Sequence, residues 1–178
     1  MRIRLVQLTD AAALARVHVD TWRTTYTGIV PDAHLASLSY EARAKRWEEI
    51  LSAVDGPGFF YVAEDEGGQV VSFAAGGPER SGDPIYKGEL YAIYLLASHQ
   101  RKGIGRQLVA TVVNRLLQAD LRSMLIWVLA QNPSRKFYEA LGGQPVREQE
   151  IVIGGATLIE VAYGWQDIRA LAQTERSP

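Results

Sequence analysis

Residues 100–106 read Gln-Arg-Lys-Gly-Ile-Gly-Arg and join an apolar segment, residues 89–96, to a helical pattern that begins near Ile104. Along that helix apolar residues recur every three or four positions, as expected of one buried face. The first turn of a helix leaves backbone N–H groups unpaired and carries partial positive charge. Glycine lets a ligand approach the backbone, and Arg101, Lys102 and Arg106 add three full charges. The segment therefore predicts an anion-binding turn, for which a diphosphate is the natural ligand.

Two common phosphate-binding loops do not fit this turn. A Walker loop needs two glycines separated by four residues and followed by Lys and then Ser or Thr, and the chain lacks this motif. A dinucleotide-binding turn needs a third glycine where Leu108 stands. The alternative interpretation is a glycine-containing turn whose cations simply lie in water.

Composition excludes several classes of protein. The 178 residues suit one domain with a sizeable core. The net charge of −1 argues against a protein that coats nucleic acid. Without cysteine there is no disulfide or thiol nucleophile, and the three scattered histidines form no HxxxH pair for a metal. No segment approaches the ~20 apolar residues of a membrane span, and the first residues contain no apolar signal segment. We therefore expect a soluble, cytoplasmic protein without a metal, a membrane or a nucleic-acid partner.

The remaining pattern predicts one α/β (α+β) domain. Strand and helix signals follow in the order β-α-α-β-β-β-α-β-α-β-β, with no repeat, linker or low-complexity tract. Gly67-Gly68 and Gly154-Gly155 each join two β-like runs, the last two near 149–153 and 157–165. Residues 76–88, rich in Gly and Pro, predict a loop. We expect the domain over residues 1–170 and a short polar tail over 171–178.

Three motifs resemble one known family. Gln100-x-x-Gly103-x-Gly105 is similar to the Q/R-x-x-G-x-G/A signature of the GCN5-related N-acetyltransferase (GNAT) superfamily, and residues 89–96 resemble its central strand. Residues 132–142, with an Asn, a Phe-Tyr pair and a Leu-Gly, resemble its other motif. Residues 22–31 look like the first-helix region of a bacterial branch. The resemblance implies a mixed, mostly antiparallel central sheet of six to seven strands flanked by about four helices.

The resemblance also implies acetyl-CoA as the acetyl donor. Its diphosphate would lie on the turn formed by Gln100, Arg101, Lys102, Gly103, Ile104, Gly105 and Arg106. Ile93, Tyr94 and Leu95 would hold the pantetheine arm as a pseudo-strand. A splay or bulge would free the N–H of Leu95 for the thioester oxygen. Asn132 and Arg135 complete the implied cofactor site. The separation of Asn132 and Tyr138 is one residue shorter than the usual family spacing, so Gln131 is an alternative to Asn132.

Two residues are candidates for proton transfer. Glu89 opens the central strand, where a carboxylate is uncommon. It is either the general base, acting directly or through a water, or a solvated charge at the end of a strand. Tyr138 is implied as the general acid for the leaving thiolate, and an ordinary core tyrosine is the alternative. Acetyl transfer to an amine needs both a base and an acid.

The resemblance places an acceptor pocket near the first helices. Trp22 and Tyr26 lie four residues apart and share a helix face, as either pocket walls or a core pair. Tyr91 and Trp127 are further pocket candidates. Gly143 stands where the family usually has Phe, which removes a core aromatic ring.

The function that the residues and the resemblance favour is transfer of acetyl from acetyl-CoA to a primary amine: a small molecule, a polyamine or a peptide N-terminus. Direct transfer in a ternary complex is expected, because no Cys can form an acetyl-enzyme. The first alternative is a non-catalytic domain that binds or senses acyl-CoA. The second is a nucleic-acid-binding module built on the three cations of the turn. A homodimer that pairs the C-terminal strands at an edge is compatible with the sequence.

Overall fold

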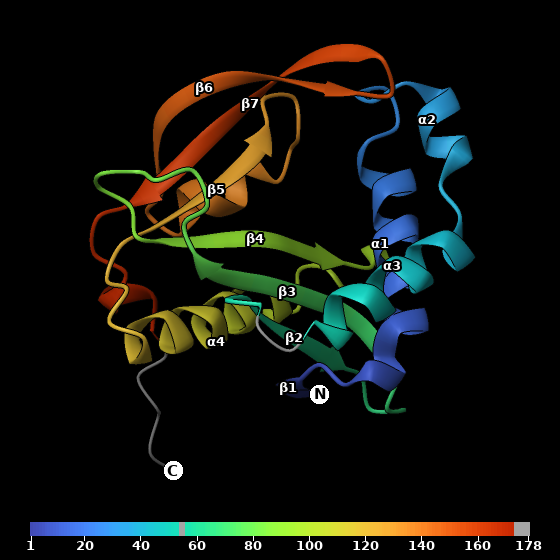
Figure 1. The fold of residues 1–178 in the computed structure, drawn as a ribbon, viewed down its shortest axis with the longest axis horizontal. Helices are drawn as coiled ribbons and strands as arrows, with labels where there is room; N and C mark the ends of the chain where they lie inside the picture. The colour runs from blue at the N-terminus through green and yellow to red at the C-terminus, as the bar shows by residue number, and fades with distance from the viewer. Residues whose placement is uncertain (54–55, 173–178) are drawn as a thin grey trace.

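The structure is a computed structural model, and it describes residues 1–53 and 56–172. These residues form one seven-stranded sheet with strand order β1-β2-β3-β4-β5-β7-β6 (Figure 1). The strands are β1 (Arg2–Leu5), β2 (Phe59–Glu64), β3 (Val70–Pro78), β4 (Gly88–Leu95), β5 (Met124–Leu129), β6 (Gln144–Ile153) and β7 (Ala156–Trp165). The α-helices are α1 (Ala11–Thr25), α2 (Asp32–Ser37), α3 (Tyr40–Ser52), α4 (Ile104–Gln118) and α5 (Arg135–Ala140). The predicted mixed, mostly antiparallel sheet is confirmed.

Helices cover both faces of the sheet. Neighbouring residues of a strand point to opposite faces. In β3, Phe73 packs with α1 and α3, whereas Ala74 packs with the apolar face of α4. The periodic residues of α4, from Ile104 to Leu116, are buried in that second cluster as the sequence predicts. The sheet therefore has an α1 face and an α4 face.

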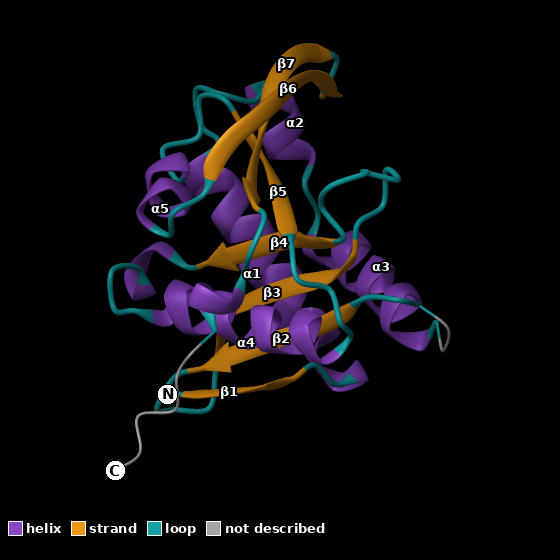
Figure 2. Ribbon diagram, turned by 90° about the vertical axis from the view of Figure 1, so that its left-hand side faces the viewer, coloured by secondary structure: helices purple, strands orange, loops and turns teal. Residues whose placement is uncertain are grey.

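The neighbouring strands β4 and β5 pair only briefly. They are the parallel pair of the sheet, and their paired positions are Gly88 with Met124 and Glu89 with Leu125. Beyond these positions the two strands diverge (Figure 2). A bulge also interrupts the other edge of β4, where Leu90 faces Gly76 and Ala92 faces Ala75, leaving Tyr91 as the extra residue. Of the splay or bulge expected to free the Leu95 N–H, the splay lies beside Leu95 on the β5 side, whereas the bulge lies at Tyr91 on the β3 side.

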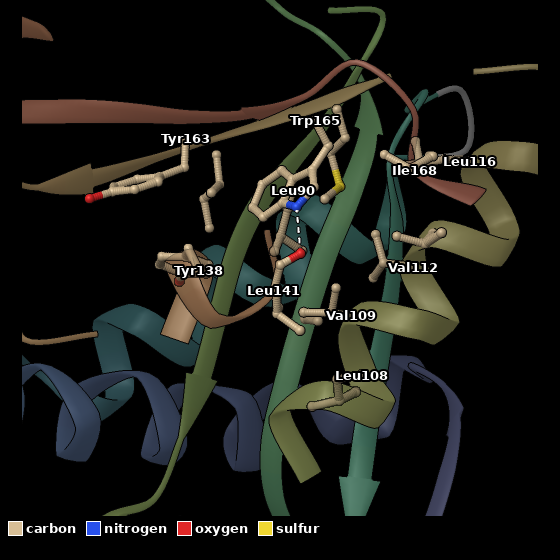
Figure 3. Close-up of a cluster of buried hydrophobic side chains, with 14 of the residues drawn as sticks. Leu90, Leu108, Val109, Val112, Leu116, Tyr138, Leu141, Tyr163, Trp165 and Ile168 are labelled. Atoms are coloured by element: carbon tan, nitrogen blue, oxygen red, sulfur yellow. Dashed lines mark hydrogen bonds between the residues drawn. The ribbon is translucent and has the colours of Figure 1, made fainter. Parts of the chain in front are cut away.

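A tryptophan fills the space that Gly143 leaves. A Cβ at Gly143 would lie 2.6 Å from Cζ2 of Trp165, so the indole occupies the room of the missing side chain. The indole N–H donates a hydrogen bond of 2.9 Å to the carbonyl oxygen of Leu141 (Figure 3). This contact ties the end of β7 to the end of α5 and so fixes the helix that carries Tyr138.

The structure differs from the sequence expectations at several element boundaries. The six-residue helix α2 was not predicted, because a single buried residue, Leu35, gives no periodic signal. β3 runs to Pro78, inside the segment expected to be a loop, and β6 begins at Gln144 rather than near Gln149. Residues 173–178 of the predicted tail lie outside the described residues. Within the ranges that the structure describes, no helix is long and apolar enough to span a membrane.

Candidate active site

The divergence of β4 and β5 opens a cavity of about 570 Å³. Its walls come from α1, β4, β5, the turn before α4, and the start of α5. The sequence-predicted residues that line it are Tyr26, Tyr91, Ile93, Tyr94, Leu95, Gln100, Arg101, Gly103, Gly105, Arg106, Trp127, Asn132 and Tyr138. The predicted residues outside its lining are Trp22, Glu89, Lys102, Ile104 and Arg135. In residues 1–53 and 56–172, no three His, Asp or Glu side chains gather as a metal site.

The turn before α4 has the geometry of an anion site. Gly103, the N-cap, has φ of 80°, a left-handed conformation that favours glycine. Gly105 lies close to α5, because a Cβ there would be 3.3 Å from Cζ of Phe137. The first N–H groups of α4 precede its first intrahelical bond, from Gln107 N to Gly103 O, and so are free to bind a ligand. Arg101 and Arg106 line the cavity at this end.

Two residues of the same turn point elsewhere. Lys102 is exposed, and Ile104 is buried in the core cluster on the α4 face. Their backbone remains part of the turn. For Lys102 and Ile104, the expected contact with a diphosphate can therefore involve only main-chain groups. Gln100 has a different role, because its side-chain amide donates a hydrogen bond of 3.2 Å to Leu95 O and joins the turn to the strand edge.

The free edge of β4 presents backbone groups to the cavity. Leu96 N–H donates to Val71 O of β3. Because successive peptide groups of a strand point to opposite edges, the N–H groups of Leu95 and Ile93 point away from β3, toward the opening. β5 pairs with β4 only at its first two residues, so it does not take up these donors. The edge thus offers the hydrogen-bonding positions of a missing strand.

Tyr138 lies at the meeting point of these walls. It is 5% exposed and lines the cavity. Burial, with a smaller contribution from Tyr94, raises its pKa above the ordinary value of a phenol. The phenol therefore keeps its proton at neutral pH and remains a potential proton donor.

Asn132 reaches the cavity and Arg135 does not. The Asn132 side-chain oxygen accepts a hydrogen bond of 2.8 Å from Ser134 N–H, and its amide donates to the Tyr26 hydroxyl at 3.4 Å. Of the two alternatives, Asn132 rather than Gln131 lines the cavity. The Arg135 guanidinium donates to the Tyr163 hydroxyl and to Ala130 O. Arg135 therefore connects α5 to β7 and to the residue that follows β5.

Glu89 is buried beside the point where β4 and β5 part, outside the cavity lining. It is 3% exposed. The Arg80 guanidinium donates to both carboxylate oxygens, at 3.0 and 2.5 Å, and lies over the Tyr91 ring, 4.2 Å from its centroid. Of the two interpretations of Glu89, the solvated charge at the end of a strand is therefore wrong. The carboxylate is held by an arginine from the β3–β4 loop.

Two aromatic residues at the end of α1 pack in the core, and one of them also reaches the cavity. The rings of Trp22 and Tyr26 are 4.8 Å apart. Both rings pack against Val30, Leu35 and Leu129, as the core interpretation expects, and Tyr26 also lines the cavity. Sequence reasoning missed other lining residues, namely Thr21, Thr25, Ala92, Ile126, Val128, Pro133, Ser134 and Phe137. Thr21 and Thr25 could have been predicted, because they lie four residues apart on one helix face beside Tyr26.

Comparisons with known proteins agree with this geometry. Residues 17–143 match the model of the acetyltransferase (GNAT) family. The chain is 45% identical over 170 residues to the uncharacterized N-acetyltransferase YuaI of Bacillus subtilis, covering 95% of each chain. Its fold is similar to the PaiA N-acetyltransferase of Thermoplasma acidophilum in complex with coenzyme A (TM-score 0.69, 20% identity, 90% and 98% covered). It is also similar to YncA of Salmonella typhimurium with acetyl-CoA (TM-score 0.67, 21% identity, 100% and 97% covered). The chain belongs to the acetyltransferase (GNAT) family.

Proposed function

We propose that the protein transfers the acetyl group of acetyl-CoA to a primary amine by direct attack in a ternary complex. One observation carries this proposal: a single cavity joins the N-terminal turn of α4, the free edge of β4, Tyr138 and an aromatic pocket. Two proteins of similar fold have structures with coenzyme A or acetyl-CoA, which supports the same donor here. The donor supplies an acetyl group activated as a thioester.

The chain's own groups fit such a donor. The N–H groups at the start of α4, with Arg101 and Arg106, bind the diphosphate. The edge of β4 at Ile93 and Leu95 hydrogen-bonds the extended arm. The N–H of Leu95 is the proposed donor to the thioester oxygen, where negative charge develops during attack.

Two protons must move during the transfer. The amine forms the new C–N bond as the C–S bond breaks, and the departing thiolate takes a proton from the Tyr138 hydroxyl. The proton lost by the amine passes to Glu89. Because Glu89 does not line the cavity, this step runs through a water molecule. The absence of cysteine supports direct transfer, since no thiol can carry the acetyl group.

Two further expectations are part of the proposal. β6 is an edge strand with mostly exposed side chains, which supports a homodimer paired along this edge. A cytoplasmic location is proposed because the chain has no cysteine for disulfides.

The test measures thiol release from acetyl-CoA with a panel of amines. We expect turnover that depends on the amine and falls strongly in Tyr138→Phe. Tight binding of acetyl-CoA without turnover on any amine would favour the alternative, a domain that binds or senses acyl-CoA. The nucleic-acid alternative predicts a gel shift that persists when coenzyme A competes.

A further inference from the structure

The two faces of the sheet contribute different kinds of side chain to the cavity lining. Ile93, Leu95, Ile126 and Val128 belong to the core cluster on the α4 face. Trp127 lies between two of them in β5 and therefore points to the α1 face. On that face the cavity is lined by two threonines and four aromatic rings, and we call this region the acceptor half. Its residues are Thr21, Thr25, Tyr26, Tyr91, Tyr94 and Trp127.

The acceptor half contains no charged side chain. In the whole cavity lining, within the described part of the chain, the charged residues are Arg101 and Arg106 at the opposite, α4 end. The two arginines beside the acceptor half lie over its rings. The Arg80 guanidinium is 4.2 Å from the Tyr91 centroid, and that of Arg147 is 5.8 Å from the Trp127 centroid.

The carboxylates nearby are already engaged. Glu89 is paired with Arg80, and Asp83 is paired with Arg147. A second ammonium group on the acceptor would find no carboxylate in the lining and would approach two guanidinium groups. Desolvating such a charge without a partner is costly. This arrangement disfavours a polyamine.

Three side chains of α1, His18, Thr21 and Trp22, have buried polar atoms without a hydrogen-bond partner among the described residues. Thr21 is 6% exposed, lines the cavity, and its hydroxyl has no hydrogen-bond partner among the described residues. The hydroxyl of Thr24, three residues further along α1, instead donates to Asp20 O at 2.9 Å, as helical threonines often do. Both ring nitrogens of His18 are also unpartnered within residues 1–53 and 56–172, and its ring lies 4.9 Å from that of Tyr94.

These unpartnered groups are neutral. Burial lowers the pKa of His18 to about 3, so its imidazole carries no charge at neutral pH. Buried polar atoms without partners are rare and require an explanation. For Thr21, which lines the cavity, a bound ligand that supplies an uncharged hydrogen-bonding group is a direct explanation.

We propose that the acceptor is a primary monoamine with a ring-sized apolar body and an uncharged hydroxyl or amide group that binds Thr21. The rings of Tyr26, Tyr94 and Trp127 contact the apolar body, and Thr21 determines specificity. This inference rests on the proposed acetyl transfer and narrows its acceptor. It disfavours polyamines, which carry a second charge, and peptides whose N-terminal residue lacks a ring.

The test compares four amines at saturating acetyl-CoA: tyramine, 2-phenylethylamine, spermidine and the tripeptide Ala-Ala-Ala, whose N-terminal residue has no ring. We expect kcat/KM to be highest for tyramine, and at least about tenfold higher for either arylalkylamine than for spermidine or the peptide. Thr21→Val keeps the shape of the side chain and removes its hydroxyl. It should lower kcat/KM for tyramine about tenfold, with a smaller loss for phenylethylamine.

Thr24→Val is the matched control, because Thr24 is exposed on the same helix and does not line the cavity. It should leave all four kcat/KM values unchanged. Unaltered acetyl-CoA affinity, measured by calorimetry, shows that Thr21→Val is folded. A preference for spermidine or the peptide, or equal losses in Thr21→Val for both arylalkylamines, would overturn the acceptor assignment alone. No thiol release with any amine would overturn the proposed function and this inference together.

Discussion

Arg80 holds the buried carboxylate of Glu89 with two side-chain hydrogen bonds and a backbone N–H at 3.3 Å. The carboxylate is inaccessible, whereas the Arg80 side chain is 62% exposed. The guanidinium is thus the partner that faces the solvent. Glu89, the proposed proton acceptor, is therefore covered by Arg80 of the β3–β4 loop.

Exchange of Glu89 for Gln separates a catalytic role from a structural one. Glu89→Gln keeps the size of the side chain but cannot take a proton. We expect kcat/KM to fall by about 100-fold, with the largest loss at low pH. Arg80→Gln leaves a buried charge without its partner, so it should lower the unfolding free energy by about 1–3 kcal/mol with a smaller loss of rate. Equal losses of rate with the same pH profile in both variants would mean that Glu89 serves only to bind Arg80.

The raised pKa of Tyr138 predicts how kcat depends on pH in the alkaline range. Because burial raises the pKa of Tyr138, the phenol remains a donor as the pH rises toward 10. We expect no loss of kcat from this group between pH 7 and 10, and a loss of about 10- to 100-fold in Tyr138→Phe.

The matched control for this variant is Tyr163→Phe. Tyr163 is buried 6.2 Å from the Tyr138 ring, and its hydroxyl interacts with Arg135 and Glu139 rather than with the cavity. This variant should lose stability but keep kcat. A Tyr138→Phe enzyme with wild-type kcat at saturating amine would exclude Tyr138 as the acid.

Substitutions at Gly103 and Gly68 separate an effect on stability from an effect on the affinity for acetyl-CoA. Its φ of 80° disfavours any other residue, so Gly103→Ala should cost about 1 kcal/mol of unfolding free energy. Gly68 has φ of 77° in the β2–β3 hairpin, with open space around it, and Gly68→Ala should cost a similar amount. Only Gly103→Ala should raise the KM for acetyl-CoA, by about tenfold. Equal KM values in the two variants would show that the turn does not bind the donor.

His18 predicts how stability depends on pH. Its folded pKa of about 3 lies below the unfolded value of 6.5, so between these values the unfolded chain binds a proton that the folded chain does not. The stability is therefore lost as the pH falls from about 6.5 toward 3, by about 2 kcal/mol at pH 5. His18→Phe removes this group and should lose less stability between pH 7 and pH 5, measured by urea unfolding. Parallel losses in the two proteins would refute the assignment.

The sequence could predict what depends on local spacing. The periodic apolar residues from Ile104 to Leu116 define the buried face of α4, and the glycines before it define the turn. The pairing of Arg80 with Glu89 depends instead on how an irregular loop folds over β4, and no local pattern encodes it. Arg135 fails as a cavity residue for a similar reason, because its partner Tyr163 comes from a distant strand. His18 and Thr21 are helical positions like any others until the packing leaves their polar atoms without partners.

The short contact between β4 and β5 has a mechanical consequence. The two paired positions, Gly88 with Met124 and Glu89 with Leu125, are the connection between two parts of the sheet, β1–β4 and β5–β7–β6. A donor whose extended arm hydrogen-bonds along the open edge of β4 supplies, for part of the reaction cycle, a strand that the polypeptide itself lacks. We therefore expect the sheet to become more rigid when acetyl-CoA binds and less rigid when coenzyme A leaves. Amide exchange at Ile93 and Leu95 would follow that cycle.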